Sequence, residues 1–508
     1  MATPALAPRM TAEDAAFLYL ERKEMGLHIG SVAVLDGPVP FESFVAGVDS
    51  KLHLIPRYRQ RVIPAPFNIG HPSWEDDPNF DIKHHIFRLQ IEAPGDDAAL
   101  RAISGKLFSQ LLDRKKPLWE IYVIEGLEHG RTALLSKTHH CMVDGVSGVA
   151  LMSIIFDTSR EMHLQVPENK PHFAPPPIPD PVQLYFKALA ANFQQGLDRL
   201  VALQTESMTM LETFTSPLTA QAMLQVAPLL AELARPADRL PFNKPCSGER
   251  EITWAEFPFG EARAIRGAIG GTVNDVALTV LTGAVTRYVK MCGDSVSRKF
   301  CRYMVPVNVR REDQRSDLGN QVSALMVNVP LDIEDAGERL KAITRRTETL
   351  KNARLADLLR LVSTMAGAAP APLQAMIAAL PFVTFGAPIF NMVSTNVPGP
   401  MIPLYACGHE MLQYYPHVPV GNDLGMGCAI QSYNQKLTFG ITSDRAAAPQ
   451  AQAMHDFLRE SFADLHRAAG LTESHHVAPT PVHKKKTAKA ADKSAVLVDS
   501  KHASVAST

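Results

Sequence analysis

The sequence predicts a mixed α/β protein built from two halves of similar size. The chain has 508 residues, which is more than one ordinary hydrophobic core accommodates. Strand-like and helix-like patterns are interspersed up to about residue 160, and again from about residue 248 to residue 470. Between them lies a proline-rich stretch, "VPENKPHFAPPPIPDPV", followed by long helical patterns, which together indicate a linker and a helical bridge.

The first half contains clear strand and helix patterns. The apolar runs "HIGSVAVLDG" and "TALLSKTHH" predict strands. The stretch "DAALRAISGKLFSQLL" predicts a helix, because Leu100, Ile103, Leu107 and Leu111 recur at helical spacing. We therefore assign residues 1–162 to an N-terminal domain and residues 163–245 to the linker and bridge.

The second half returns to the mixed pattern. "REITWAEFPF" and "FCRYMVPVNV" predict strands, and "GTVNDVALTVLTGAVTRYVKM" predicts a helix. We assign residues 246–470 to a C-terminal domain. Residues 471–508 are rich in Lys, Ala and Ser, and they hold too few large apolar residues to offset the entropy of ordering, so we predict a disordered tail.

An uncharged stretch runs from Leu361 to Gly408. Several prolines and glycines interrupt it, which argues against a single membrane-spanning helix of about 20 residues. Burial in the core and a wall that contacts lipid are both compatible with this composition.

Composition excludes some classes of protein. The chain has 51 basic and 52 acidic residues and a formal charge of −1, whereas a nucleic-acid binder needs a basic excess. The six cysteines form no Cys-x-x-Cys pair, so neither a zinc ribbon nor a disulfide framework is indicated. The N-terminal residues lack the apolar core of a signal peptide. A reducing, cytoplasmic setting is expected.

The stretch "THHCMVDGVSG", residues 138–148, holds two adjacent histidines followed by an Asp-Gly pair. It follows a predicted strand and precedes "VSGVALMSIIF", which has helical periodicity. The histidines therefore sit on a strand-to-helix turn, where Gly145 supplies backbone freedom and a reactive group can be exposed on a rigid scaffold.

Three interpretations of this stretch remain open. A metal site would use His139, His140 and Asp144, but adjacent residues at a strand end point to opposite sides. In the second interpretation the histidines are ordinary polar residues, because the doublet His84-His85 occurs without an Asp-Gly pair after it. In the third, one imidazole is a general base, because its ordinary pKa of about 6.5 suits proton abstraction from a hydroxyl. Asp144 then orients the base or anchors the turn.

Several motifs in order resemble those of one family. The His stretch resembles the HHxxxDG signature of CoA-dependent acyltransferases and condensation domains, and the chain from about residue 9 to 468 resembles the bacterial wax ester synthase/diacylglycerol acyltransferase family. The motifs that carry this resemblance are "MTAEDAAFLYLERKEMGLHIGSVAVLDG", "PRYRQRV", "PSWEDDPNFDIKHHIFRL", "KPLWEIYVIEGL", "TVNDVALTVLTGAV", "VPVNVRRED", "LGNQVSALMVNVPL", "STNVPGP" and "SYNQKLTFGITSD".

This resemblance implies an O-acyltransferase with two mixed-sheet domains and a tunnel between them. Acyl-CoA is implied as co-substrate, diacylglycerol or a long-chain alcohol as acceptor, and no metal or other cofactor. His140 is implied as the base, His139 as its support, and Asp144 and Gly145 as structural residues of the turn. The Asn-Asp helix and the "STNVPGP" block imply substrate-side residues, which are Asn274, Asp275, Ser394, Thr395 and Asn396.

Other interpretations give different expectations. Cys141, next to His140, could form a covalent acyl intermediate. A condensation-type enzyme that uses carrier-bound thioesters and a lipid-binding homologue without turnover are the alternative functions. The lead expectation is an enzyme at the inner face of a membrane or on lipid droplets, where its lysine-rich tail could contact anionic lipid. Trp119 is expected to be a buried packing residue.

Overall fold

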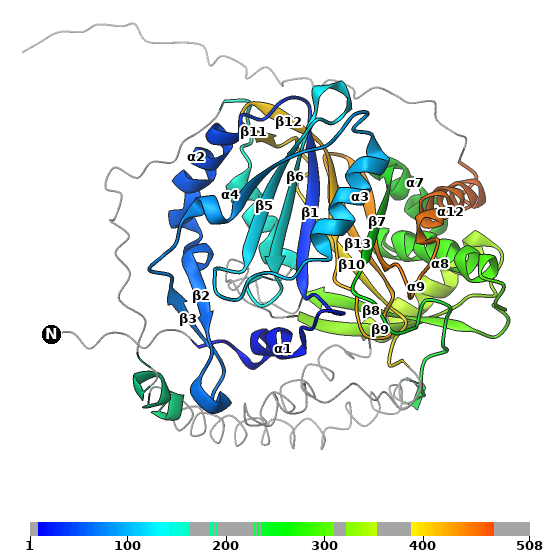
Figure 1. Cartoon of the computed structure of the whole chain (residues 1–508). Helices are drawn as coiled ribbons and strands as arrows, with labels where there is room; N and C mark the ends of the chain where they lie inside the picture. Colours follow the sequence, from blue (N-terminus) through cyan, green and yellow to red (C-terminus); the bar gives the residue numbers. More distant parts are fainter. Residues whose placement is uncertain are drawn as a thin grey trace, which may run out of the picture. The chain divides into compact units, whose positions relative to one another are not determined.

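Two mixed six-stranded sheets dominate the part of the chain that the structure describes (Figure 1). The structure is a computed structural model, and the described residues are 9–143, 145–161, 180, 182–186, 188–190, 228, 231–232, 235–308, 322–352 and 388–471. The mixed α/β class and the presence of one sheet for each half confirm the prediction from the sequence.

The first sheet has the strand order β11-β12-β1-β6-β5-β4. Its strands are β1 (His28–Leu35), β4 (Ile86–Gln90), β5 (Trp119–Glu125), β6 (Thr132–His139), β11 (Tyr405–Ala406) and β12 (His409–His417). β1 is antiparallel to both β6 and β12, whereas β4 is parallel to β5. Although β12 follows most of the second half in sequence, it completes the sheet of the first half.

The second sheet has the order β7-β14-β13-β10-β8-β9. Its strands are β7 (Arg250–Pro258), β8 (Phe300–Asn308), β9 (Val322–Pro330), β10 (Met392–Pro398), β13 (Met426–Tyr433) and β14 (Lys436–Asp444). The central strand β10 is parallel to both β13 and β8, and the other pairs are antiparallel. A separate hairpin consists of β2 (Gln60–Ile63) and β3 (Ser73–Asp76).

Helices cover the sheets. The described helices are α1 (Ala12–Leu20), α2 (Phe41–Lys51), α3 (Asp97–Phe108), α4 (Gly145–Ile155), α7 (Phe259–Ile269), α8 (Val273–Met291), α9 (Ala336–Asn352) and α12 (Met454–Ala468). The first sheet packs α2 and α4 against one face and α3 against the other, while α7, α8, α9 and α12 share one core with the second sheet. Among the described residues, no single helix is long and apolar enough to cross a membrane. Helices α7 and α8 taken together have the necessary length and composition, but a bend of 99° lies between them.

Trp119 is one of the largest buried side chains of the first half. Its ring stacks on Tyr58 and on His85, with centroid distances of 4.5 Å in both cases. The indole Nε1–H donates to the carbonyl of Tyr58 at 2.8 Å. Trp119 is therefore a packing residue, as the sequence predicted, and His85 of the second histidine doublet belongs to the same stack.

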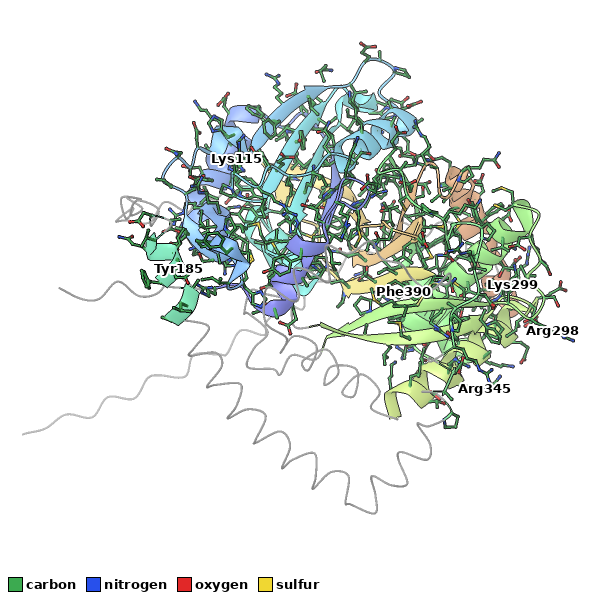
Figure 2. The ribbon with its side chains drawn as sticks, turned by 60° about the horizontal axis from the view of Figure 1, so that its bottom comes forward. Lys115, Tyr185, Arg298, Lys299, Arg345 and Phe390 are labelled. Carbon is green, nitrogen blue, oxygen red and sulfur yellow. The ribbon has the colours of Figure 1, made fainter. Side chains whose placement is uncertain are left out.

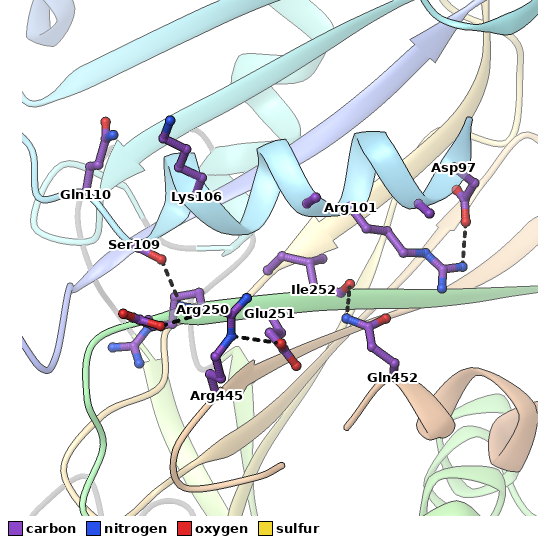
Figure 3. Close-up of a pocket in the computed structure, with 13 residues that line it drawn as sticks. Asp97, Arg101, Lys106, Ser109, Gln110, Arg250, Glu251, Ile252, Arg445 and Gln452 are labelled. Atoms are coloured by element: carbon purple, nitrogen blue, oxygen red, sulfur yellow. Dashed lines mark hydrogen bonds and ion pairs between the residues drawn. The ribbon is translucent and has the colours of Figure 1, made fainter. Parts of the chain in front are cut away.

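The two halves meet where α3 lies along β7 (Figure 3). A Cβ atom on Gly105 would lie 2.5 Å from the carbonyl oxygen of Arg250, so only glycine permits this close approach. Trp254 on β7 donates its Nε1–H to Asp97 at 3.0 Å, and the guanidinium of Arg101 lies over its ring at 5.0 Å. A charged groove of about 680 Å³ remains between the two elements.

Arg250 also connects the halves through its side chain. Its Nη1 pairs with the buried carboxylate of Asp444 at 2.7 Å. Its Nη2 donates to the carbonyls of Glu24, at 2.8 Å, and Val420, at 2.9 Å. Both terminal nitrogens of this buried guanidinium therefore have partners, as a stable buried ion pair requires.

The predicted domain boundaries remain predictions. Most of residues 163–245, residues 361–387 of the uncharged stretch and residues 472–508 of the tail lie outside the described residues. Strand β12 follows the predicted boundary near residue 245 in sequence but pairs with β1 of the first half. The boundary therefore divides the sequence into two parts without dividing the sheets in the same way.

We expect Arg250→Ala to lower the free energy of unfolding by about 3–5 kcal/mol, because it leaves the carboxylate of Asp444 buried without its cation. Chemical denaturation of the purified variant measures this loss. Arg445→Ala is the matched control. Arg445 forms an ion pair with Glu251, but its side chain is 66% exposed, and such surface ion pairs contribute at most about 1 kcal/mol to the free energy of unfolding. Similar losses in the two variants would contradict this assignment.

Candidate active site

A cavity of about 870 Å³ lies between the two sheets. Its wall includes residues of β1, β6 and β12 from the first sheet, of β8, β9, β10 and β13 from the second, and of α1 and α4. Most of these side chains are apolar, including Phe17, Ile29, Leu134, Met304 and Ile430. Phe390, which also lines the cavity, is labelled in Figure 2 between the blue ribbon of α1 and the green strands β8 and β9.

The alternation of β6 decides which side chains reach this cavity. Ser136, Thr138 and His140 line it, together with Leu134 two residues earlier. The intervening Lys137 points to the other face, where its Nζ donates to the carbonyl of Leu107 in α3 at 3.2 Å. Because successive strand residues face opposite sides of a sheet, the two histidines of the doublet separate.

His140 sits on the cavity wall in a defined orientation. Its backbone N–H donates to the carbonyl of Leu27 at 2.9 Å. Its ring stacks on Phe17 of α1, with a centroid distance of 4.1 Å and an angle of 9° between the ring planes. The imidazole is therefore held flat against an aromatic ring at the edge of an apolar space. Gly145 begins α4 just beyond it, whereas Asp144 lies outside the described residues.

His139 is completely buried on the opposite side. Its Nε2 lies 3.2 Å from Oε1 of Glu21, and its Nδ1 accepts the N–H of Cys141 at 3.2 Å. Glu21 also accepts the N–H of Leu27 and is paired with Arg114 at 3.0 Å. Burial alone would raise the pKa of Glu21, but the contacts with His139, Leu27 and Arg114 lower it to about 2.

The divergence of the two rings leaves each histidine with a separate environment. In the described part of the chain, no three His, Cys, Asp or Glu side chains gather closely enough to hold a metal ion. His139 is buried inside the fold, and His140 lines the cavity.

Cys141 is a poor nucleophile in this setting. The thiol is 1% exposed. Burial, together with the nearby carboxylates of Asp14 and Glu21, raises its pKa well above the ordinary value of a thiol. A neutral, buried thiol gives no support to a covalent acyl intermediate on this residue.

The substrate-side residues implied by the sequence lie in three different settings. Thr395 and Asn396 of β10 line the cavity, and Asn274 accepts a hydrogen bond from Nδ2 of Asn396 at 3.1 Å. Ser394 is 4% exposed and is not one of the described residues that line the cavity. Asp275 is buried and accepts the backbone N–H of Thr272, which caps α8, and the hydroxyl of Thr347 at 2.7 Å.

The structure adds residues that the sequence alone did not single out. Phe17 and Glu21 lie four residues apart at the end of α1, and both contact the histidine doublet. His417 of β12 lines the cavity and lies 2.8 Å from the hydroxyl of Thr442 through Nδ1. Burial and the charges of Arg250 and Lys137 lower the pKa of His417 well below its ordinary value, so this ring is neutral at pH 7.

Comparison with solved structures defines the class of fold. A wax ester synthase/diacylglycerol acyltransferase from Marinobacter aquaeolei VT8 is 25% identical, with a TM-score of 0.62 over 91% of this chain and 100% of its own. The starter condensation domain of rhizomide synthetase shares the fold, with a TM-score of 0.54 and 14% identity over 92% of this chain and 95% of its own. The protein thus has the two-sheet fold of acyltransferases of this type.

Comparison with family models and relatives is more specific. Residues 10–277 match the wax ester synthase/diacylglycerol acyltransferase catalytic domain, and residues 318–466 match the C-terminal domain of the same family. The chain belongs to the wax ester synthase/diacylglycerol acyltransferase family, and it is an O-acyltransferase. Two Mycobacterium tuberculosis proteins named as diacylglycerol O-acyltransferases are 29% identical over 459 residues, with 90% of this chain and 95% of the relative covered, and 30% identical over 474 residues, with 91% and 100% covered.

The buried contacts of Glu21 predict a pH-dependent contribution to stability. The pKa of about 2 in the folded protein lies below the ordinary value of 4.5, so the charged carboxylate contributes about 3 kcal/mol above pH 4.5, and this contribution is lost as the pH falls toward 2. We expect Glu21→Gln to be less stable than the wild type near neutral pH, with the difference shrinking below pH 4.5.

Denaturant unfolding of both proteins, from neutral pH down to about pH 3, measures this difference. Glu24→Gln is the control, because Glu24 is exposed and lies three residues away. A stability difference that does not change with pH would show that the charge of Glu21 is not what holds His139.

Proposed function

We propose that this O-acyltransferase moves an acyl group from acyl-CoA to the hydroxyl of diacylglycerol, or of a long-chain alcohol, to form triacylglycerol or a wax ester. The single observation that carries the proposal is the imidazole of His140 on the wall of a largely apolar cavity of about 870 Å³. A cavity of this size and lining suits lipid chains, and an imidazole on its wall is suited to taking a proton from a hydroxyl.

In the proposed reaction, His140 takes the proton of the acceptor hydroxyl while that oxygen attacks the thioester carbonyl. The tetrahedral intermediate then expels the CoA thiolate, which takes the proton from His140 and leaves as the thiol. A thioester is already activated, so positioning and one base are sufficient for the chemistry. The contact with Phe17 fixes the plane of the ring, and His139, held by Glu21, fixes the backbone on which His140 is carried.

We also propose roles for the remaining residues of the site. Thr395 and Asn396 contact the substrate from the second sheet, and Asn274 orients the amide of Asn396. Asp144 holds the turn, and Asp275 holds the start of α8, as its hydrogen bonds to Thr272 and Thr347 support.

The proposed acceptors are insoluble in water, so we place the enzyme in the cytoplasm, in peripheral contact with the inner face of a membrane or with lipid droplets. Delivery of such acceptors to the cavity requires contact with the lipid phase that holds them.

We expect His140→Ala to lower kcat/KM for ester formation at least about 100-fold, because general-base catalysis contributes that much or more. The assay uses the purified full chain with a labelled acyl-CoA, offered separately with diacylglycerol and with a long-chain alcohol. Unchanged circular dichroism of the variant excludes unfolding as the cause.

His84→Ala is the matched control, because His84 is the exposed member of the other doublet in the first half. It is expected to keep full activity. Retained turnover in His140→Ala would refute the proposed role of the base, and transfer only from an acyl-carrier protein would refute the proposed donor.

A further inference from the structure

Hydroxyl groups interrupt the apolar wall of the cavity close to His140. The hydroxyl of Thr138 lies 3.3 Å from that of Tyr58, and the hydroxyl of Ser136 lies 2.9 Å from that of Ser31. All four residues line the cavity. Most of the wall around them is aliphatic or aromatic, so these groups are a polar track on an apolar surface.

The track is aligned with the base. Ser136 and Thr138 precede His140 at two-residue steps, so all three face the same side of the first sheet, about 7 Å apart from one to the next. Ser31 of β1 lies directly opposite Ser136 in the strand register. Tyr58 comes from the segment before β2 and is 3% exposed.

Counting hydrogens shows that the track has donors to spare. Thr138 and Tyr58 carry two hydroxyl hydrogens, and their mutual hydrogen bond uses one. The second cluster consists of Ser31, Ser136 and Tyr414, which also lines the cavity. It carries three hydroxyl hydrogens, and the bonds of Ser31 with Ser136 and with Tyr414 use two of them. Each of the two clusters thus retains one hydroxyl hydrogen beyond the bonds within it, and leaving such a donor without an acceptor in an apolar wall is costly.

We infer that these hydroxyls bind the ester carbonyls of a diacylglycerol acceptor and so favour it over a long-chain alcohol. This inference rests on the proposed function. Diacylglycerol carries ester carbonyls within a few bonds of its free hydroxyl. When that hydroxyl is at His140, a carbonyl lies within reach of the next polar position, Thr138. A long-chain alcohol has no second oxygen, so it leaves the hydroxyls unsatisfied.

The test compares the two acceptors in single variants of the full chain. Thr138→Val and Ser136→Ala each remove one hydroxyl with little change in volume. At saturating acyl-CoA, the ratio of kcat/KM for diacylglycerol to kcat/KM for the alcohol is expected to fall about three- to tenfold in each variant, the loss typical of one neutral hydrogen bond. Thr138→Ser, which keeps a hydroxyl, is expected to restore the ratio.

Matched controls remove hydroxyls elsewhere. Thr253→Val removes a buried hydroxyl on β7, and Tyr122→Phe removes a hydroxyl on β5 that donates to Glu120. Neither residue is one of the described residues that line the cavity, and both controls are expected to leave the ratio unchanged.

An unchanged ratio in Thr138→Val and Ser136→Ala, or an equal loss for both acceptors, would overturn the inference. A rise in the KM of acyl-CoA alone would assign the track to the donor instead and overturn it as well. A wild-type protein that forms neither ester contradicts the proposed function itself, which distinguishes that failure from this one.

Discussion

The buried contact between His139 and Glu21 fixes the position of the histidine doublet. Glu21 follows the last residue of α1 and also holds Arg114, so three distant segments of the chain meet at one carboxylate. Because His139 is held on the side of the first sheet that faces away from the cavity, the next residue along the chain has to face the cavity. Phe17, one helical turn before Glu21, then packs flat on the ring of His140. One short helix therefore positions both histidines from opposite sides.

The cavity depends equally on an exchange of strands between the halves. β12 leaves the second half, pairs with β1 and completes the first sheet. Its last two residues and the chain after it, Pro416 to Gly421, form part of the cavity wall. The guanidinium of Arg250, bound to the carbonyls of Glu24 and Val420, joins the two halves near this crossing. Neither half encloses the site without the other.

Periodicity in the sequence was sufficient to predict the faces of elements, but it could not predict their partners. The apolar run before the histidine doublet predicted β6, and strand alternation predicted that the two rings would diverge. No local pattern indicates that β12 pairs with β1, or that Asn274 meets Asn396 across 122 positions of sequence. The same is true of Glu21, since a glutamate at the end of a short helix is ordinary until the fold brings His139 beside it. The resemblance to the HHxxxDG signature, and not a local pattern, singled out His140, which is the imidazole that lines the cavity.

The polar groups of the cavity are divided between the sheets, and this division has a consequence for catalysis. The proposed base, His140, and the hydroxyls of Thr138 and Ser136 lie on or directly after strand β6 of the first sheet, whereas Thr395 and Asn396 lie on the second. In the proposed reaction, an acyl group and an acceptor in the cavity would therefore be aligned by surfaces from two different sheets. Because proton transfer and attack tolerate displacements of only a fraction of an ångström, roughly 0.5 Å, the packing that joins the sheets sets the geometry of the reaction. Residues far from the cavity that hold this junction are thus part of the reason that the base and the acceptor meet in register.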